Sequence, residues 1–427
     1  MTTTTPAPVK TVLTRQQRQC HLLLLLLLTE QHFTPELLST INGTDLETLN
    51  NDIADTHEEI HACHRLVIRP NTEGHYSIEG TNLDKQLCLF HWLRRALRIT
   101  PDFVEQQIIP RIKQNLKQQN IPRALYDETN LHALVSLSAR RLARQFSERD
   151  ARFLRFWLLY SLHYHLADCL PEFNRLQREW IENRNEFSAA CEIFGHLNRQ
   201  LSAPVQGQHS HMLGFVFSLL KTPDPDSTAN PHEKQLHFSI RRMTHDFRTQ
   251  TGLRFSDEEG LHRQLYIHLF QALERVVLGI GIETSLPEEI VRLYPRLIGT
   301  TQQVLQPLSG HYQLHFSAQE TGLIAVIFGA WLMQADALHE KQVLLLTGDN
   351  PPREKELEKQ VRELTLLPLN IQYQTVQAFH HEGTPADIDL VISPYETHFP
   401  LVSPPLIHAV EPLTLHQQQR ILTILEG

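Results

Sequence analysis

The chain has 427 residues, which is too long for a single hydrophobic core and predicts three or four domains. Its formal charge of −9 and its pI near 6.3 exclude the strong overall attraction to nucleic acid of a basic DNA-coating protein. Its five cysteines are scattered, without a Cys-x-x-Cys pair, which argues against a disulfide framework and fits a reducing cytoplasm.

Residues 1–13 are predicted to be a disordered leader, because Met1–Val9 is rich in threonine and proline. The leucine block Leu22–Leu28 follows basic residues, as in a signal peptide, but no small-residue cleavage site comes after it. Its seven leucines also fall far short of the roughly 20 apolar residues that span a bilayer. We therefore expect a buried first helix in a soluble, cytoplasmic protein.

Residues 14–80 are predicted to form three helices followed by a β-hairpin. Thr14 can cap a helix through the leucine block, and Pro35 stands in the first turn of a second helix. A third helix covers residues 45–62, and two strands flank the turn at residues 71–74. This order resembles a winged helix-turn-helix.

The third helix has the wrong charge for reading DNA. Between Gly43 and His61 there is no lysine or arginine, and six carboxylates are present: Asp45, Glu47, Asp52, Asp55, Glu58 and Glu59. A duplex carries one phosphate charge per roughly 1.7 Å, and proteins bind it mainly by displacing counterions with cations. Asn50 and Asn51 alone offer little for contacts to base edges. We expect a scaffold with weakened or lost DNA binding.

Residues 83–104 are predicted to form a basic connecting helix with Arg94, Arg95 and Arg98. Further basic residues follow at Arg111, Lys113, Lys117, Arg123, Arg140, Arg141 and Arg144. This section is either a nucleic-acid surface or a solvated helix face, and ordinary helical charge patterns favour the solvated face.

The stretch Leu261–Ile282 carries the strongest motif. Leucines recur every fourth residue, which places them on one helical face: Leu261, Leu265, Leu269 and Leu273. His268 lies at the edge of that apolar stripe, and Arg275, about two turns later, points the same way. Phe316–Gln334 is nearly all apolar and is predicted to be a buried helix.

This motif resembles the phosphotransferase-regulation domain (PRD) of bacterial antiterminators and sugar-operon activators. Its helix has the form L-x-x-H-L-x-x-A-L-x-R, which is matched by Leu265, His268, Leu269, Ala272, Leu273 and Arg275. Leu293–Leu297 and Phe328–Leu332 match as well. The resemblance implies an all-helical module at residues 229–338, whose histidine receives phosphate from sugar-transport phosphocarriers. His268, with Arg275 nearby, is therefore the candidate phosphorylation site.

The chemistry fits this role, because imidazole has an ordinary pKa of about 6.5 and is largely neutral near pH 7. A phosphoryl group next to Arg275 could reorder a helical interface. The alternative is a hydrogen-bonded histidine on a half-buried helix.

Residues 105–222 resemble a first, degenerate PRD. Aligning Arg144 with Arg275 puts Leu137 at the place of His268, and Ser218 or Phe217 at the usual second histidine. In the second copy, Ile327 stands where the second histidine is expected. The resemblance thus leaves His268 as the remaining acceptor of four.

Residues 340–427 contain β-like runs alternating with helical segments, which predicts a small parallel α/β domain. The domain resembles the transporter IIB-type domain of sugar-operon activators, which carries a phosphorylated cysteine after its first strand. Here that loop begins at Thr347, and residues 340–427 contain no cysteine, so the thiol chemistry is lost.

Other chemistry is not supported by the sequence. His57, His61 and Cys63 are close together, yet none of the histidine groups has the spacing of a structural zinc site. Phosphate loops, nucleophile elbows and metalloprotease motifs are absent from the sequence, so we expect neither an enzyme nor a cofactor.

We therefore expect a mainly α-helical protein with an N-terminal winged helix, two PRD modules and a small C-terminal α/β domain. The resemblance implies a transcription-linked regulator of the stationary-phase or nutrient-limitation response. It also implies phosphocarriers as partners and a homodimer. The competing reading is a degenerate interaction scaffold without DNA contact or phosphotransfer.

Overall fold

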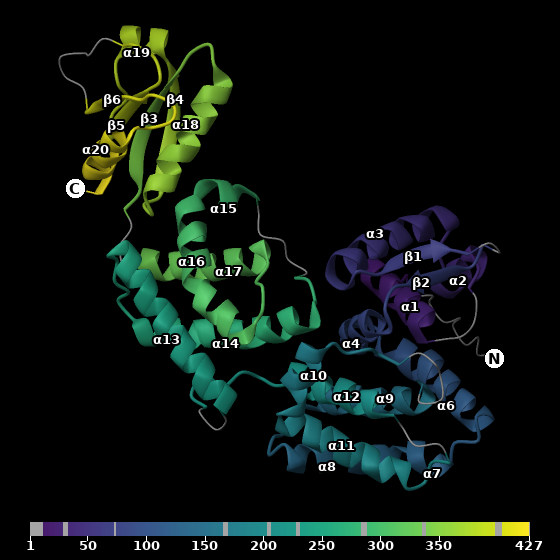
Figure 1. The fold of residues 1–427 in the computed structure, drawn as a ribbon. Helices are drawn as coiled ribbons and strands as arrows, with labels where there is room; N and C mark the ends of the chain where they lie inside the picture. Colours follow the sequence, from purple (N-terminus) through teal and green to yellow (C-terminus); the bar gives the residue numbers. More distant parts are fainter. Residues whose placement is uncertain are drawn as a thin grey trace, which may run out of the picture. The chain divides into compact units, whose positions relative to one another are not determined.

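The computed structural model describes residues 12–28, 33–71, 74–164, 170–202, 206–227, 231–282, 288–334, 339–397 and 404–426. Nearly all of the predicted leader, residues 1–13, lies outside them. The chain divides into two compact units. The first contains residues 1–222 and 274–283, and the second contains residues 223–273 and 284–427 (Figure 1). None of the described helices combines the length and the apolar character that a membrane span requires.

The first unit begins with the predicted three helices and hairpin: α1 (Arg15–Leu28), α2 (Pro35–Asn42), α3 (Leu46–His64), β1 (Val67–Pro70) and β2 (Tyr76–Glu79). The two strands pair antiparallel. Leu22 to Leu25 are at most 1% exposed, so the leucine block forms a core helix as predicted. The order of elements is confirmed, and the assignment as a winged helix stays a prediction.

The predicted connecting helix is wrong at its C-terminal end. Helix α4 (Asn82–Ile99) stops before Thr100, which leaves the helical region with φ −147°. The cause is Pro101, because a proline disfavours the helical conformation of the residue before it. The chain then continues through α5 (Pro101–Phe103), the π-helix η1 (Val104–Ile108) and α6 (Ile109–Gln118).

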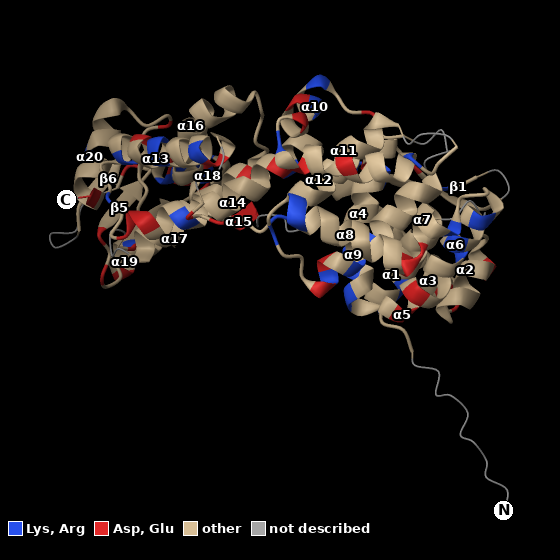
Figure 2. Cartoon of the chain, turned by 90° about the horizontal axis from the view of Figure 1, so that it is seen from below, with Lys and Arg blue, Asp and Glu red and all other residues tan. Residues whose placement is uncertain are grey.

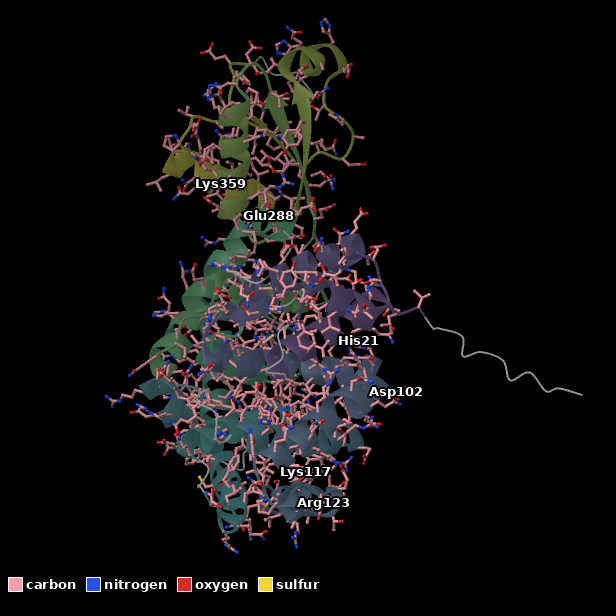
Figure 3. The ribbon with its side chains drawn as sticks, turned by 90° about the vertical axis from the view of Figure 1, so that its right-hand side faces the viewer. His21, Asp102, Lys117, Arg123, Glu288 and Lys359 are labelled. Carbon is pink, nitrogen blue, oxygen red and sulfur yellow. The ribbon has the colours of Figure 1, made fainter. Side chains whose placement is uncertain are left out.

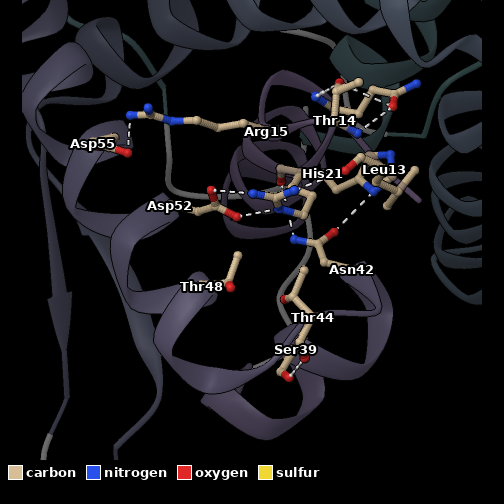
Figure 4. Close-up of polar contacts among 12 residues, drawn as sticks. Leu13, Thr14, Arg15, His21, Ser39, Asn42, Thr44, Thr48, Asp52 and Asp55 are labelled. Atoms are coloured by element: carbon tan, nitrogen blue, oxygen red, sulfur yellow. Dashed lines mark hydrogen bonds and ion pairs between the residues drawn. The ribbon is translucent and has the colours of Figure 1, made fainter.

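His21 ties this break to the first two helices. Its Nε2 lies 2.8 Å from Thr100 Oγ1. Its Nδ1 lies 3.1 Å from Asn42 Oδ1 (Figure 4). The ring also stacks on Phe103 at 3.7 Å between centroids. Both ring nitrogens of this buried imidazole thus have a polar partner. The ring links α1 to Asn42, Thr100 and Phe103.

Among their described residues, the two predicted PRD modules contain helices and no strands. The first continues with α7 (Arg123–Tyr126), α8 (Glu128–Arg141), α9 (Glu148–Tyr164), α10 (Arg175–Glu182), α11 (Asn185–Asn198) and α12 (Gly207–Leu219). The second contains α13 (Pro231–Thr251), α14 (Glu258–Leu278), α15 (Glu288–Leu293), α16 (Pro295–Tyr312) and α17 (Ala318–Gln334). Helix α14 belongs to the second unit up to Leu273 and to the first unit from Glu274 onward.

The C-terminal part is the predicted parallel α/β domain. Its elements are β3 (Lys341–Thr347), α18 (Pro351–Leu364), β4 (Leu369–Thr375), α19 (Val376–Glu382), β5 (Leu390–Ser393), β6 (Leu406–His408) and α20 (Leu415–Glu426). The sheet has the order β4-β3-β5-β6 with parallel pairing throughout. Val343 and Leu345 of β3 pack into one core cluster, and Leu344 and Leu346 pack into another. Burial of both faces explains the continuous apolar run of this strand. Helix α19 was not predicted.

Two buried histidines make the stability of the first unit depend on pH. Burial lowers the pKa of His21 to about 4, although the hydrogen bond with Asn42 acts in the opposite direction and raises it. Burial, helped by the charges of His91 and Arg65, lowers the pKa of His64 to about 3. Below the ordinary pKa of about 6.5 the unfolded chain binds protons that the folded chain does not. Stability is therefore fully present above that pH and is lost as the pH falls toward 4.

We expect the free energy of unfolding of the first unit to fall between pH 6.5 and pH 4.5, by about 1.4 kcal/mol per pH unit for each of the two histidines. Urea denaturation at several pH values measures this slope. His64→Gln should flatten it, whereas His416→Gln, at an exposed position, should not. An unchanged slope in His64→Gln would contradict this origin.

Candidate functional site

His268 lies on α14 at the edge of the apolar stripe, as predicted. Its side chain is 20% exposed, and the neighbouring Leu265 and Leu269 are fully buried. Its Nε2 lies 3.4 Å from Oε2 of Glu320, whose side chain is 3% exposed. Nε2 itself is buried and, among the described residues, has no partner with hydrogen-bond geometry. The imidazole therefore meets a buried carboxylate on one side and solvent on another.

Glu320 is the residue of this site that the sequence analysis missed. It lies in the first turn of α17, and its backbone N–H donates to Ser317 Oγ at 3.2 Å. The N-terminal end of a helix dipole stabilises a negative charge there. Glu320 is the single carboxylate of an otherwise apolar helix. A buried acid requires a partner, so this carboxylate was the sequence signal that could have identified the site.

The pair has a direct chemical consequence for the imidazole. The negative charge of the Glu320 carboxylate, 3.4 Å from Nε2, favours a proton on that nitrogen electrostatically, without a formed hydrogen bond. This arrangement favours the Nε2–H tautomer. In that tautomer the free lone pair lies on Nδ1.

Arg275 lies on the same helix as His268, as predicted. Its half-buried side chain follows His268 by seven residues on α14, but it belongs to the first unit and His268 to the second. Support of a phosphoryl group on His268 by Arg275 stays a prediction.

The next residue along the helix, Glu274, is held by an ion pair inside the first unit that the sequence analysis did not predict. Its side chain is 4% exposed and pairs with Arg184. Trp180 Nε1 lies 3.3 Å from both carboxylate oxygens, and the Arg184 guanidinium lies 4.5 Å from the Trp180 ring centre. Gln177 Nε2 donates to Val277 O at 3.1 Å. The C-terminal end of α14 is thus fixed by buried polar contacts.

The predicted lost acceptor positions carry neither the histidine nor the cysteine that receives phosphate in the family. Leu137 is half-buried on α8, and Ile327 is 8% exposed on α17. Ser218 is buried on α12, where its Oγ accepts a bond of 2.9 Å from Arg184. Thr347 ends β3 and is half-buried.

The structure favours a different alignment of the first PRD. Counting back from the last helix of each module, α9 takes the place of α14, and α12 takes that of α17. Ring contacts agree, because Phe146 meets Phe217 at 6.2 Å and Phe255 meets Phe328 at 5.9 Å. Matching these pairs puts two buried residues, Leu159 and Val216, at the acceptor positions instead of Leu137 and Ser218.

Three of the six carboxylates in and before the third helix form ion pairs with arginines. Asp52 binds Arg18 at 2.6 Å, and Asp55 pairs with Arg15 (Figure 4). Glu59 binds Arg95 at 2.7 Å. Figure 2 colours the acidic residues of the chain red. The exposed residues of α3 are Leu46, Glu47, Asn50, Asn51, Ala54, Glu58, His61 and Ala62. Together they are less acidic than the sequence indicates, yet they include no lysine or arginine.

Two arginines of the connecting helix form contacts within the first unit. Arg94 lies 3.4 Å from Asp150, and Arg95 stacks on Trp92 at 4.6 Å besides binding Glu59. These contacts support the interpretation as ordinary helix-face charges rather than a nucleic-acid surface.

His57 Nδ1 accepts a bond from Ile68 N at 3.1 Å, and Cys63 is buried. Within the described ranges, no group of three or more His, Cys, Asp or Glu side chains is arranged to hold a metal ion.

We expect Glu274→Gln to lower the free energy of unfolding by about 3–5 kcal/mol, because it leaves Arg184 buried without its counter-charge. Urea denaturation followed by tryptophan fluorescence reports this change. In the double variant with Arg184→Met, the loss should be smaller than the sum of the single losses. The control Glu179→Gln breaks an exposed pair with Arg175 and should cost less than about 1 kcal/mol. Equal effects of the two glutamate changes would contradict the anchoring role.

Comparisons with known proteins identify two family models and a relative that covers nearly the whole chain. A family model described as the PRD domain matches residues 241–331, which contain both His268 and Glu320. A second, described as the C-terminal domain of the stationary phase-inducible protein CsiE, matches residues 341–425. The stationary phase-inducible protein CsiE of Escherichia coli (strain K12) is 46% identical over 416 residues, covering 97% of this chain and 98% of that protein.

Proposed function

Since the chain belongs to the CsiE family and contains a PRD domain, we propose that it is a cytoplasmic, transcription-linked regulator of the stationary-phase response, modulated by phosphorylation at His268. The observation that supports this most is the geometry of His268, half-open to solvent with Nε2 against the buried Glu320 carboxylate. A PRD domain also makes phosphocarriers of the sugar phosphotransferase system the natural donors.

In the proposed step, the Nδ1 lone pair of His268 attacks the phosphorus of a donor phosphohistidine. The donor's P–N bond breaks, and its electron pair returns to the donor nitrogen. The proton on Nε2 stays beside Glu320, so the product is a phosphoramidate whose second nitrogen remains protonated. Glu320 acts as a positioning residue.

Phosphorylation would then change the packing between α14 and α17. It adds about 1.5 to 2 negative charges next to a carboxylate that is already buried. Like charges in a region of low dielectric repel, so the product state weakens the contact between the two helices.

The surface around His268 suits a protein partner. Ile267 on α14 is 42% exposed, and Val326 and Met333 on α17 are 39% and 48% exposed. Trp331 on α17 donates to Gln264 on α14 at 2.6 Å, which holds the two helices side by side. A phosphocarrier that reaches His268 would cover these apolar side chains, and a homodimer is the second occupant that the family resemblance implies.

We expect label from phosphoenolpyruvate, passed through the general phosphocarriers, on the wild type and none on His268→Ala. His245→Ala, an exposed position in the same module, should be labelled like the wild type. Glu320→Gln should slow labelling about tenfold or more, the range found for groups that orient a histidine. The phosphorus NMR signal should be that of phosphate on Nδ1. Equal label on the wild type and on His268→Ala would exclude the proposal.

The competing function is a degenerate interaction scaffold without DNA contact or phosphotransfer. Its lack of DNA contact is favoured by the exposed face of α3, which carries Glu47 and Glu58 and no lysine or arginine. The two functions differ at His268, which receives phosphate only in the first.

In gel shifts at low salt, where non-specific affinity is greatest, we expect the wild type to leave genomic DNA fragments unshifted. Glu47→Lys with Glu58→Lys should create a weak, salt-sensitive shift, because it turns this face basic. A sequence-specific shift by the wild type would refute the scaffold function.

A further inference from the structure

The second unit contains a cavity of about 830 Å³ that the proposed function does not use. It lies among α15, the start of α16, α18 and β4. Glu288 and Lys359, which line it, are labelled in Figure 3. The volume is within the range of small-molecule sites, which is roughly 300–1,000 Å³.

The wall of this cavity offers a flat ring that is held in place. Tyr373 is 54% exposed, while its hydroxyl donates to Glu358 Oε2 at 2.5 Å. Glu358 is buried and is held in turn by Arg362 at 2.9 Å. Burial, together with the bond to Glu358, raises the pKa of Tyr373 to about 12, so the phenol remains a donor. Val291, which is 48% exposed, adds an apolar side chain to the lining.

The charges of the lining leave cations in excess. Glu354 accepts from Gly348 N and from the Tyr395 hydroxyl, both at 2.7 Å, and Glu358 is occupied as described. Lys355 and Lys359 are exposed one turn apart on α18. Among the described residues, the ion pairs that involve this helix are formed by Arg362 and Glu358 and not by the two lysines. Glu288 is the remaining carboxylate of the lining.

We propose that this cavity binds a small organic anion that carries a flat ring. The ring lies against Tyr373 and Val291, and the anionic group lies between Lys355 and Lys359. A ring stacks on a fixed aromatic face without ordering it first, which limits the entropy lost on binding. The anion provides the counter-charge that the two lysines lack. A ligand here touches both the regulation module and the C-terminal α/β domain.

Titration of the full chain with 8-anilinonaphthalene-1-sulfonate, a naphthalene ring with a sulfonate, tests this proposal. Dye fluorescence should rise with saturation, and the affinity should fall in high salt. Lys355→Gln with Lys359→Gln should weaken binding about tenfold, because two counter-charges are lost. Glu288→Gln should strengthen it.

The matched control is Lys117→Gln, an exposed lysine of the first unit that is also labelled in Figure 3. It should bind the dye like the wild type. Unchanged affinity in the double lysine variant, or an equal loss in Lys117→Gln, would overturn the proposal. His268→Ala should bind normally, so a failure of phosphotransfer and a failure of this site are distinguishable.

Displacement of the dye separates the sources of the anion. Indole-3-acetate supplies a ring with a carboxylate, adenosine 5′-monophosphate supplies a ring with a phosphate, and inorganic phosphate supplies an anion alone. Displacement by either ring compound, with little by inorganic phosphate, is the expected result and shows which anionic group is preferred. Failure of both ring compounds, or equal displacement by inorganic phosphate, would contradict the proposed class of ligand.

Discussion

The apolar stripe of α14 carries two polar side chains whose buried partners fix the helix in its surroundings. His268 faces Glu320 within the second unit, and Glu274, less than two turns later, pairs with Arg184 within the first. Each carboxylate is almost fully buried and therefore requires its partner. A change of charge on the imidazole of His268 is consequently felt by a carboxylate that cannot turn to water. The proposed switching by His268 rests on this constraint.

Much of the fold could be predicted from local signals. The leucine block, the proline at the start of α2 and the apolar runs of the C-terminal strands each determine an element on their own. The prediction failed at Thr100, where the proline that follows outweighed a continuous helical pattern. It also missed α19, because seven residues between two strands offer little periodicity. In the first PRD, similarity of sequence led to α8, while the order of helices and the ring contacts favour α9 as the counterpart of α14.

The candidate site was predictable only in its first residue. His268 lies in a recognisable motif, but Glu320 follows it by 52 positions and meets it only through the packing of α17 on α14. The same holds for the six carboxylates near α3. Sequence shows their sign, whereas only the structure shows that Asp52, Asp55 and Glu59 neutralise arginines of α1 and α4. Ion pairs between residues far apart in the chain produce no periodic pattern in the sequence. They determine which charged side chains stay unpaired at the surface, where they can contact a partner.

The most direct test of this account is the proton position on the His268 ring. A long-range proton–nitrogen correlation spectrum of the histidine rings, with His268 identified by its loss in His268→Gln, reads the tautomer. The account predicts a proton on Nε2 and a free lone pair on Nδ1, and it predicts that Glu320→Gln removes this preference. A proton on Nδ1 in the wild type would contradict it.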